Sequence, residues 1–290
     1  MEAGGKRYIV HKSRSDEFKV WNLSDLHLLS SSCAEKELLR DIKTIADDPQ
    51  SYWFGGGDYV DYIGYDDGKR FDPDCVAASL SIRDLGALGK RSVETVRDWL
   101  APIKSKCLGL LLGNHEKQYQ KRHQQEDLHA WLCTELGVAN LGYSAFVDVV
   151  FVRESKAKKT GLVLDAAAIE RNNCNASSFR FFLHHGAGYA QTPGGKLNRL
   201  IQFMNAFEAD IYMIGHVHDK TGRAHPVLSA DQYCAKLTQR LRVGVISGSY
   251  LRTYQQGVTS YGEQRGYAPT QIGASWVSIT PDTRAIRAEL

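Results

Sequence analysis

The chain has 290 residues, of which 43% are hydrophobic and 24% are charged. This balance is that of an ordinary globular protein with one large core or two small ones. The formal net charge is +3, which suits an anionic substrate but is smaller than the charge of a dedicated nucleic-acid-binding protein.

The sequence carries no sign of membrane association or of a disulfide framework. Its first ten residues have no apolar signal-peptide core, and no apolar run approaches the length of a membrane span. The six cysteines are widely spread, without a close pair of the zinc-finger or redox kind: Cys33, Cys75, Cys107, Cys133, Cys174 and Cys234. We therefore expect a cytoplasmic protein with no membrane partner and with reduced, buried thiols.

Short apolar runs predict the first elements of the fold. Residues 18–23 are expected to form a strand with functional residues at its carboxyl-terminal tip. Apolar residues at helical spacing predict a helix over 35–46. Residues 52–54 predict a second strand, which ends in a sharp turn at the three glycines 55–57. Residues 62–74 have the composition of a loop.

The middle of the chain is predicted to form helices on either side of one buried strand. Helices are expected near 75–86 and 92–105. The continuous apolar run 108–112 is typical of a strand that is buried on both faces. A single helix is then expected over 117–136, stopped by Gly137.

The remaining apolar runs predict five strands and one helix. The sequence contains no internal repeat and no long linker. Strands are expected at 146–152, 179–183, 211–214, 243–246 and 276–279, a basic turn at 153–160 and a helix at 197–207. We predict one domain over 1–290, because the motifs described next span residues 25 to 218 and a division would split them. Its core would cover about 18–248, followed by a Tyr/Arg/Gly-rich loop and a final strand in 249–290.

Five polar motifs follow the ends of strand-like runs. They are Asp25-Leu26-His27, Gly57-Asp58-Tyr59-Val60-Asp61, Gly113-Asn114-His115-Glu116, His184-His185-Gly186 and Gly215-His216-Val217-His218. Residues i and i+2 of an extended chain point to the same face, so Asp25 and His27 can converge on one metal ion. The same spacing relates His216 and His218. The two oxygens of Asp58 can bridge two ions about 3.5–4 Å apart.

This ordered set of motifs resembles the calcineurin-like metallophosphoesterase superfamily over residues 20–220. The resemblance implies an α/β fold, a four-layer αββα sandwich in which two mixed β-sheets are flanked by helices. It also implies a first metal held by Asp25, His27, Asp58 and His218, and a second held by Asp58, Asn114, His184 and His216. Of the adjacent pair, His184 is the expected ligand, because relatives place the ligand two residues before a Gly or Pro and Gly186 fits that register.

The same resemblance implies a dinuclear metal-dependent phosphoester hydrolase. Two divalent ions, manganese first and iron or zinc as alternatives, would activate water as a hydroxide nucleophile and neutralise charge on the phosphoryl oxygens. His115 is implied as a catalytic residue that is not a ligand and that assists the leaving group.

Further polar residues are weaker candidates. Asp61 and Glu116 are expected to orient the metal ligands, and His185 could donate a hydrogen bond behind them. Lys117, Arg252 and Arg265 are candidates for substrate contacts. The alternatives are a solvated helix face for Lys117 and ordinary loop packing for the Tyr/Arg-rich segment, whose aromatic and arginine side chains could also recognise a nucleotide.

The leading functional hypothesis is a phosphodiesterase that acts on nucleic acid or nucleotides, because diester cleavage must expel a poor alkoxide leaving group and His115 can assist it. One alternative is a small-molecule phosphomonoesterase. A second is a metal-binding scaffold that has lost catalysis. The sequence leaves the oligomeric state open.

Overall fold

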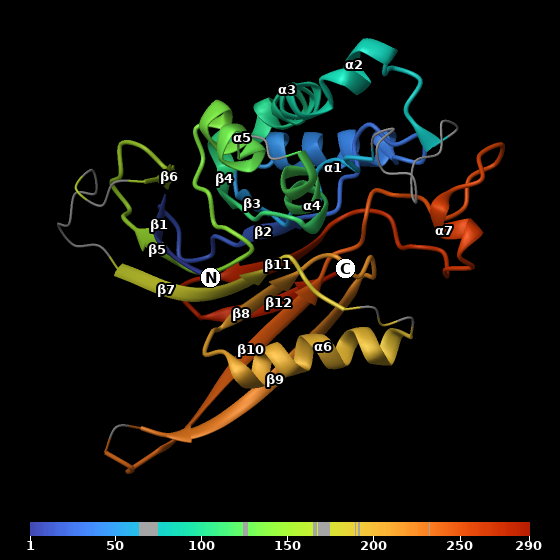
Figure 1. Cartoon of the computed structure of the whole chain (residues 1–290). Helices are drawn as coiled ribbons and strands as arrows, with labels where there is room; N and C mark the ends of the chain where they lie inside the picture. Colours follow the sequence, from blue (N-terminus) through green and yellow to red (C-terminus); the bar gives the residue numbers. More distant parts are fainter. Residues whose placement is uncertain are drawn as a thin grey trace.

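Two mixed β-sheets lie face to face in the computed structural model, with helices on both outer sides (Figure 1). The structure describes residues 1–63, 75–123, 127–164, 167, 175–188, 190, 192–231 and 233–290. The predicted α/β fold with two mixed sheets flanked by helices is therefore confirmed.

The larger sheet has seven strands. Their order across the sheet is β6 (Gly161–Val163), β1 (Glu2–His11), β5 (Ser144–Arg153), β7 (Asn175–His184), β8 (Ile211–Ile214), β10 (Leu237–Ile246) and β9 (Thr221–Ala230). Strands β7, β8 and β10 run parallel to one another, whereas β5 pairs with β7 in the antiparallel sense. The outer part of the β9–β10 hairpin projects away from the body of the molecule (Figure 1).

The smaller sheet has five strands, and its parallel part carries the first three motifs. The order is β12 (Ala285–Glu289), β11 (Ser275–Thr280), β2 (Phe18–Leu23), β3 (Ser51–Gly55) and β4 (Cys107–Leu110). Strands β2, β3 and β4 are parallel neighbours. Because the carboxyl ends of parallel neighbours meet at one edge of a sheet, the loops that follow these strands are brought together.

Helices cover the outer faces of the two sheets, except the short α7 (Tyr261–Gln264), which lies to one side of them (Figure 1). The helices are α1 (Glu35–Asp47), α2 (Ile82–Gly86), α3 (Leu88–Leu100), the 3₁₀ helix η2 (Ala101–Lys106), α4 (Asn114–His123), α5 (Leu128–Leu136), α6 (Pro193–Ala206) and α7. Buried residues of α1, α3 and α5 share one apolar cluster with the smaller sheet, and α6 packs on the larger sheet. A separate apolar cluster, with Phe54 and Phe181 among its members, fills the space between the sheets.

Several predicted elements differ from the structure. The helix expected over 117–136 is two helices, and the second begins after Asp127, whose side chain accepts a hydrogen bond from the backbone nitrogen of Ala130 at 2.9 Å. An aspartate at such a position favours a new helix start. Within the predicted helix 75–86, only Ile82–Gly86 is helical. In the predicted loop 62–74, residues 64–74 lie outside the described part of the chain.

Strands β1, β6, β9 and β12 were missed, because little of their sequence alternates between apolar and polar residues. Strand β9 contains Pro226 and is a sheet edge, where proline is tolerated. Among the described cysteines, all five have free thiols, but Cys234 is exposed and Cys75 is half-buried rather than buried as expected; Cys174 lies outside the described residues. In the described part of the chain, no helix combines the length and apolarity needed to cross a membrane.

A buried histidine on α5 makes the stability of this fold depend on pH. His129 is 2% exposed and stacks on Tyr59 with ring centroids 6.3 Å apart. Burial lowers the pKa of His129 to about 4. Since an unfolded histidine titrates near 6.5, the unfolded chain binds more protons between these two values, and stability is lost as the pH falls from about 6.5 toward 4.

We expect this one group to remove about 3 kcal/mol of unfolding free energy over that range. In urea titrations with a chelator present, His129→Phe should therefore lose about 2–3 kcal/mol less than the wild type between about pH 7 and about pH 4.5. His225→Gln on the half-exposed part of β9 serves as the control and should follow the wild type. Equal losses in all three proteins would contradict the assignment.

Candidate metal centre

The loops that follow the strands hold the motif residues in an unusual backbone conformation. Five motif residues have positive φ values between 49° and 68°: Asp25, His27, Asp58, His216 and His218. Non-glycine residues rarely adopt this region, so the surrounding structure must enforce it. Part of that enforcement comes from adjacent loops, because Asp25 N donates to Gly57 O at 2.9 Å and His27 N donates to Asp58 O at 3.2 Å.

Two motif glycines are required by close packing around Asp58. A Cβ atom on Gly113 would lie 2.1 Å from the Asp58 backbone nitrogen and 2.2 Å from its Oδ1. A Cβ atom on Gly57 would lie 2.7 Å from His185 Nδ1, and its φ of +94° also favours glycine. The glycines thus allow the loops after β3 and β4 to approach each other at the centre.

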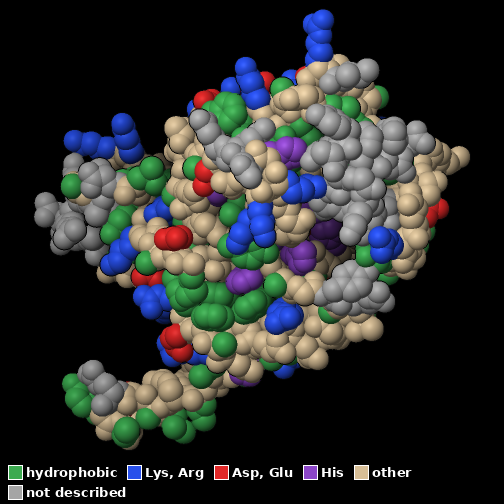
Figure 2. All heavy atoms as spheres, viewed as in Figure 1, with side chains coloured by type: hydrophobic (Ala, Val, Ile, Leu, Met, Phe, Trp, Pro, Cys, Tyr) green, Lys and Arg blue, Asp and Glu red, His purple; other side chains and the backbone are tan. Residues whose placement is uncertain are grey.

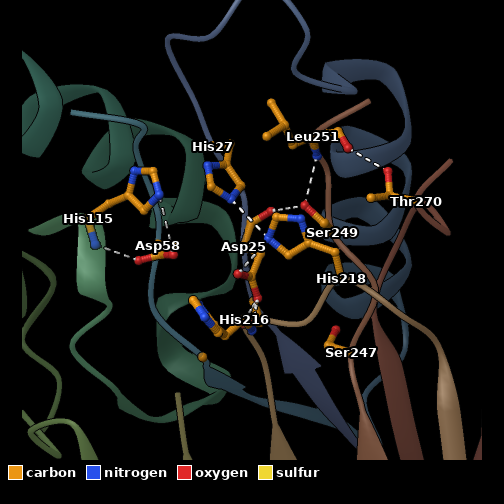
Figure 3. Close-up of polar contacts among 12 residues, drawn as sticks. Asp25, His27, Asp58, His115, His216, His218, Ser247, Ser249, Leu251 and Thr270 are labelled. Atoms are coloured by element: carbon orange, nitrogen blue, oxygen red, sulfur yellow. Dashed lines mark hydrogen bonds and ion pairs between the residues drawn. The ribbon is translucent and has the colours of Figure 1, made fainter. Parts of the chain in front are cut away.

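A first group of donor atoms comes from Asp25, His27 and His218, which lie within 4.8 Å of one another. His218 Nε2 is 3.0 Å from Asp25 Oδ1 and 3.3 Å from His27 Nε2 (Figure 3). On the other side of the His27 ring, Nδ1 donates to the Asp61 carboxylate. This bond fixes the imidazole so that Nε2 faces the other donors.

A second group comes from Asp58, His185 and His216. His185 is fully buried, and its Nε2 lies 3.3 Å from Asp58 Oδ2. Its Nδ1 donates to Gly56 O at 2.7 Å, which again leaves Nε2 directed at the group. Asn114, the first residue of α4, places its side-chain oxygen 2.9 Å from His185 Nε2.

The chemistry around Asn114 fits a cation. The position of its side-chain oxygen is 2.9 Å from His185 Nε2, 2.8 Å from His216 Nδ1 and 3.2 Å from Asp58 Oδ2. In a metal-binding form, in which His185 Nε2 carries no proton, a turned-over amide would face three acceptors with only two hydrogens. One divalent ion among the four atoms would satisfy all of them, and mixed oxygen and nitrogen ligands suit manganese, iron or zinc.

Two histidines of the donor groups, His27 and His185, favour the protonated form. Burial alone would lower the pKa of His27, but the nearby carboxylates of Asp61, Asp58 and Asp25 raise it to about 9. Burial also opposes protonation of His185, and Asp58 and Asp25 nevertheless raise its pKa to about 10. The carboxylates therefore hold positive charge at the centre, as protons when no metal is bound.

Of the two adjacent histidines, His185 lies with the donor groups, whereas His184, the ligand expected from the sequence, points away from them. Its ring centroid lies 4.7 Å from that of Phe203 on α6, and its Nδ1 accepts a hydrogen bond from Gly186 N at 2.8 Å. Side chains alternate along a strand, so His184 shares the α6 side with Phe182. His185 continues the opposite side, which faces the smaller sheet and the donor groups.

His115 lies in the first turn of α4, next to the donor groups. Its Nδ1 donates to Asp61 O at 2.6 Å, and its Nε2 is 3.9 Å from Asp58 Oδ2. Its backbone nitrogen donates to Asp58 Oδ1 at 2.9 Å. The neighbouring Glu116 is buried and accepts from the backbone nitrogens of Asp58 at 3.2 Å and Tyr59 at 2.7 Å. Glu116 thus fixes the Asp58 loop.

A cavity of about 510 Å³ adjoins the donor groups and is lined by His27, Asp58, His115, His216 and His218. Parts of the segment 251–270 line the same cavity. Figure 2 shows exposed histidine atoms grouped on one hollowed face of the molecule. For the Tyr/Arg-rich segment, the sequence left open whether it recognises a nucleotide or only packs as an ordinary loop. In the structure, parts of this segment form the cavity wall.

The two residues just before this segment also hold Asp25 in place. Ser249 Oγ and Tyr250 N both donate to Asp25 O, at 3.1 Å and 2.9 Å. Tyr250 is itself anchored, because its hydroxyl donates to the buried Asp41 carboxylate at 2.7 Å. Nothing in the motifs before residue 220 indicated this role.

The predicted substrate contacts have different positions. Arg252 lines the cavity, and its Nη2 lies 2.6 Å from Glu37 Oε1. Lys117 is exposed, with its Nζ 5.6 Å from the centre of the Tyr143 ring, and Arg265 is also exposed. Neither is among the described residues that line the cavity.

One cavity-lining cation was missed by sequence reasoning. Lys196 projects from α6, and its Nζ lies 3.6 Å from Asp219 Oδ2. No sequence signal identified it, because its helix carries none of the five motifs. Its position became apparent only when the fold brought α6 beside the loop after β8.

Comparison with known proteins agrees with this site. The calcineurin-like phosphoesterase family model matches residues 18–220, and the chain belongs to this family. It is therefore a phosphoric ester hydrolase of a family that uses divalent metal ions. A comparison with curated proteins found no significant match.

Solved structures with detectable similarity share little sequence identity with this chain. A metallophosphoesterase from Sphaerobacter thermophilus has 12% identity and a TM-score of 0.39, over 94% of this chain and 88% of that one. A single mutant of Vps29 from Entamoeba histolytica has 12% identity and a TM-score of 0.37, over 94% and 97%. A predicted phosphoesterase from Streptococcus pneumoniae has 11% identity and a TM-score of 0.31, over 91% and 84%.

Proposed function

We propose that this protein is a dinuclear metal-dependent phosphodiesterase acting on nucleotides or nucleic acid, with manganese as its first metal. Its first ion would be held by Asp25, His27, Asp58 and His218, and its second by Asp58, Asn114, His185 and His216. The observation that carries the choice of a diester is the position of His115, beside the shared ligand Asp58 and facing the cavity.

Two divalent ions held by these residues would make a hydroxide nucleophile available at neutral pH and would neutralise charge on the phosphoryl oxygens. The chain's own contribution begins with orientation. The Asp61 carboxylate and the Gly56 carbonyl accept from the Nδ1 atoms of His27 and His185, so both rings present Nε2. Glu116 keeps the loop that carries Asp58 in place through two backbone nitrogens.

His115 supplies the proton that the leaving group needs. Its Nδ1 hydrogen is engaged by the Asp61 carbonyl, which leaves Nε2 on the side of Asp58 and the cavity. When the P–O bond breaks, the imidazolium Nε2–H passes its proton to the departing alkoxide, which leaves as the alcohol. Proton donation of this kind accelerates cleavage most when the leaving group is a poor one, such as an alkoxide.

The charges around the cavity also favour a diester over a monoester, which carries more negative charge at neutral pH. Among the described lining residues, the Lys and Arg side chains are Lys196 and Arg252. Each already faces a carboxylate, Asp219 or Glu37. A monoanionic diester requires less additional positive charge than a dianionic monoester does.

The direct test compares bis-p-nitrophenyl phosphate, p-nitrophenyl phosphate and single-stranded DNA, with manganese, zinc and iron supplied in turn. We expect the diester to be cleaved faster than the monoester, and fastest with manganese. A preference for the monoester without nuclease activity would favour a phosphomonoesterase. No cleavage of any substrate with any metal would favour an inactive scaffold.

Replacing His115 should have an effect that depends on the leaving group. For a diester with an alkyl leaving group, His115→Ala should lower kcat by about 100-fold, because proton donation is lost. For a p-nitrophenyl leaving group, which needs little protonation, the loss should stay below about 10-fold. Metal content should not change, since the proposal assigns His115 to neither ion.

The control is Gln118→Ala, an exposed position on the same helix, which should leave both rates unaltered. Steady-state kinetics with the two substrates and metal analysis of each variant give the comparison. An equal loss of kcat with both leaving groups, or a loss of bound metal, would show that His115 does not act as the proton donor to the leaving group.

A further inference from the structure

The wall formed by the segment Leu251–Thr270 is an ordered part of the cavity. Thr270 Oγ1 donates to Leu251 O at 2.7 Å, which ties the two ends of the segment together. Within it, Ser260 Oγ donates to Thr253 O, and Tyr267 N donates to Gly262 O at 2.9 Å. These bonds hold the ends and turns of the wall in fixed positions. A rigid wall of this kind can select a substrate by its shape.

The wall lies on a definite side of the metal centre. In Figure 3, Leu251 and Thr270 lie beyond His218, on the opposite side from His115. His115 marks where the leaving group departs in the proposed reaction. The ester group that remains on phosphorus must occupy another part of the cavity, and the wall lines that part.

The chemistry of the wall suits a planar ring. Tyr267 lines the cavity, together with the apolar residues Leu251, Ala268 and Pro269, and Val217 lines it from the loop after β8. Apart from histidines, Tyr267 is the aromatic residue among the described lining residues. Tyrosine binds nucleobases and aryl groups by stacking, and apolar neighbours add buried contact area.

The charges favour a small substrate over a polymer. A groove for single-stranded nucleic acid combines stacking residues with unneutralised positive charge along the backbone path. Here the cavity-lining Arg252 and Lys196 are engaged by Glu37 and Asp219. Among the described lining residues, Tyr267 offers a stacking surface for one ring, and the neutralised Arg252 and Lys196 leave no excess positive charge for a polyanionic backbone. This combination suits a substrate with a single ring and a single phosphate.

We propose that Tyr267, with Leu251 and Pro269, forms a subsite for the planar ring of a low-molecular-weight phosphodiester, carried on the ester group that does not leave. The ring is a nucleobase or a simple aryl group. This assignment rests on the proposed phosphodiesterase function and gives its substrate class.

The test uses diesters that share a p-nitrophenyl leaving group and differ in the other ester: methyl, phenyl and thymidine 5′. For the wild type, we expect a KM about tenfold lower for the two ring-bearing substrates than for the methyl ester, within the range of base–aromatic stacking. Tyr267→Ala should raise the KM of the ring-bearing substrates about tenfold, with kcat nearly unaltered and no effect on the methyl ester. Tyr267→Phe should keep the preference, because it keeps the ring.

Tyr254→Ala is the matched control, since Tyr254 belongs to the same segment, is 46% exposed and is not among the residues lining the cavity. A wild type that cleaves all three substrates with equal KM would overturn the subsite and leave the phosphodiesterase intact. So would a Tyr267→Ala effect that is equal for the methyl and ring-bearing esters. If the wild type cleaves none of them while it hydrolyses p-nitrophenyl phosphate, the proposed function itself fails.

Discussion

Asp58→Asn should lower kcat/KM by at least about 10³-fold, or about 4 kcal/mol of transition-state stabilisation, and should reduce bound metal from two ions to one or none per chain. Asp58 is buried beside both donor groups, with its Oδ2 3.3 Å from His185 Nε2 and 3.9 Å from His115 Nε2. An amide offers one oxygen and no charge, so it cannot bridge two cations as a carboxylate does.

Metal content by elemental analysis and kcat/KM on bis-p-nitrophenyl phosphate check this prediction together. Asp47→Asn is the control, because the Asp47 side chain is 65% exposed and its salt bridge to Lys43 is a surface pair worth under about 1 kcal/mol. Circular dichroism should show both variants folded. Two ions per chain and near-normal turnover in Asp58→Asn would refute the bridging role.

The adjacent histidines provide a second large effect with an internal control. His185→Ala should lose the second ion and about 10³-fold in kcat/KM, because its fully buried imidazole contacts both Asn114 and Asp58. His184→Ala should retain both ions and stay within a few-fold of wild-type kcat/KM, because its ring packs against Phe203 instead.

Both variants should be compared at saturating manganese and at limiting manganese, with thermal melting recorded for each. His184→Ala is expected to lower the melting temperature, since it removes an aromatic contact under α6 and the acceptor for Gly186 N. The reverse pattern, with metal lost in His184→Ala and kept in His185→Ala, would restore the assignment made from motif register.

The sequence was sufficient to predict that the motifs converge, because that follows from topology. Asp25, Asp58 and Asn114 follow the carboxyl ends of parallel neighbours, and such ends share one edge of a sheet. The choice between His184 and His185 required knowing which side of β7 faces α6. A motif register says nothing about that side, although the alternation along the strand could have indicated it once α6 was placed.

Other features depend on contacts that are distant in the chain. The positive φ of Asp58 is maintained among loops that come from different strands, so no local pattern predicts it. Strand β9 escaped detection because none of its residues is buried, so it does not need an apolar face. The position of the segment 251–270 beside the metal centre also arises from tertiary packing, through bonds that join Tyr250 to Asp41 and Asp25.

The hydrogen bonds of Tyr250 to Asp25 and Asp41 mark a position after which the chain could be exchanged for another segment. Ser249 and Tyr250 bind the Asp25 carbonyl and the Asp41 carboxylate, so an engineered relative must keep them to keep Asp25 in place. Beyond Tyr250, the chain forms cavity wall up to Thr270 and then rejoins the smaller sheet at β11. Exchange of the stretch between these two fixed ends would alter which esters are accepted while the hydrolytic centre is inherited unchanged.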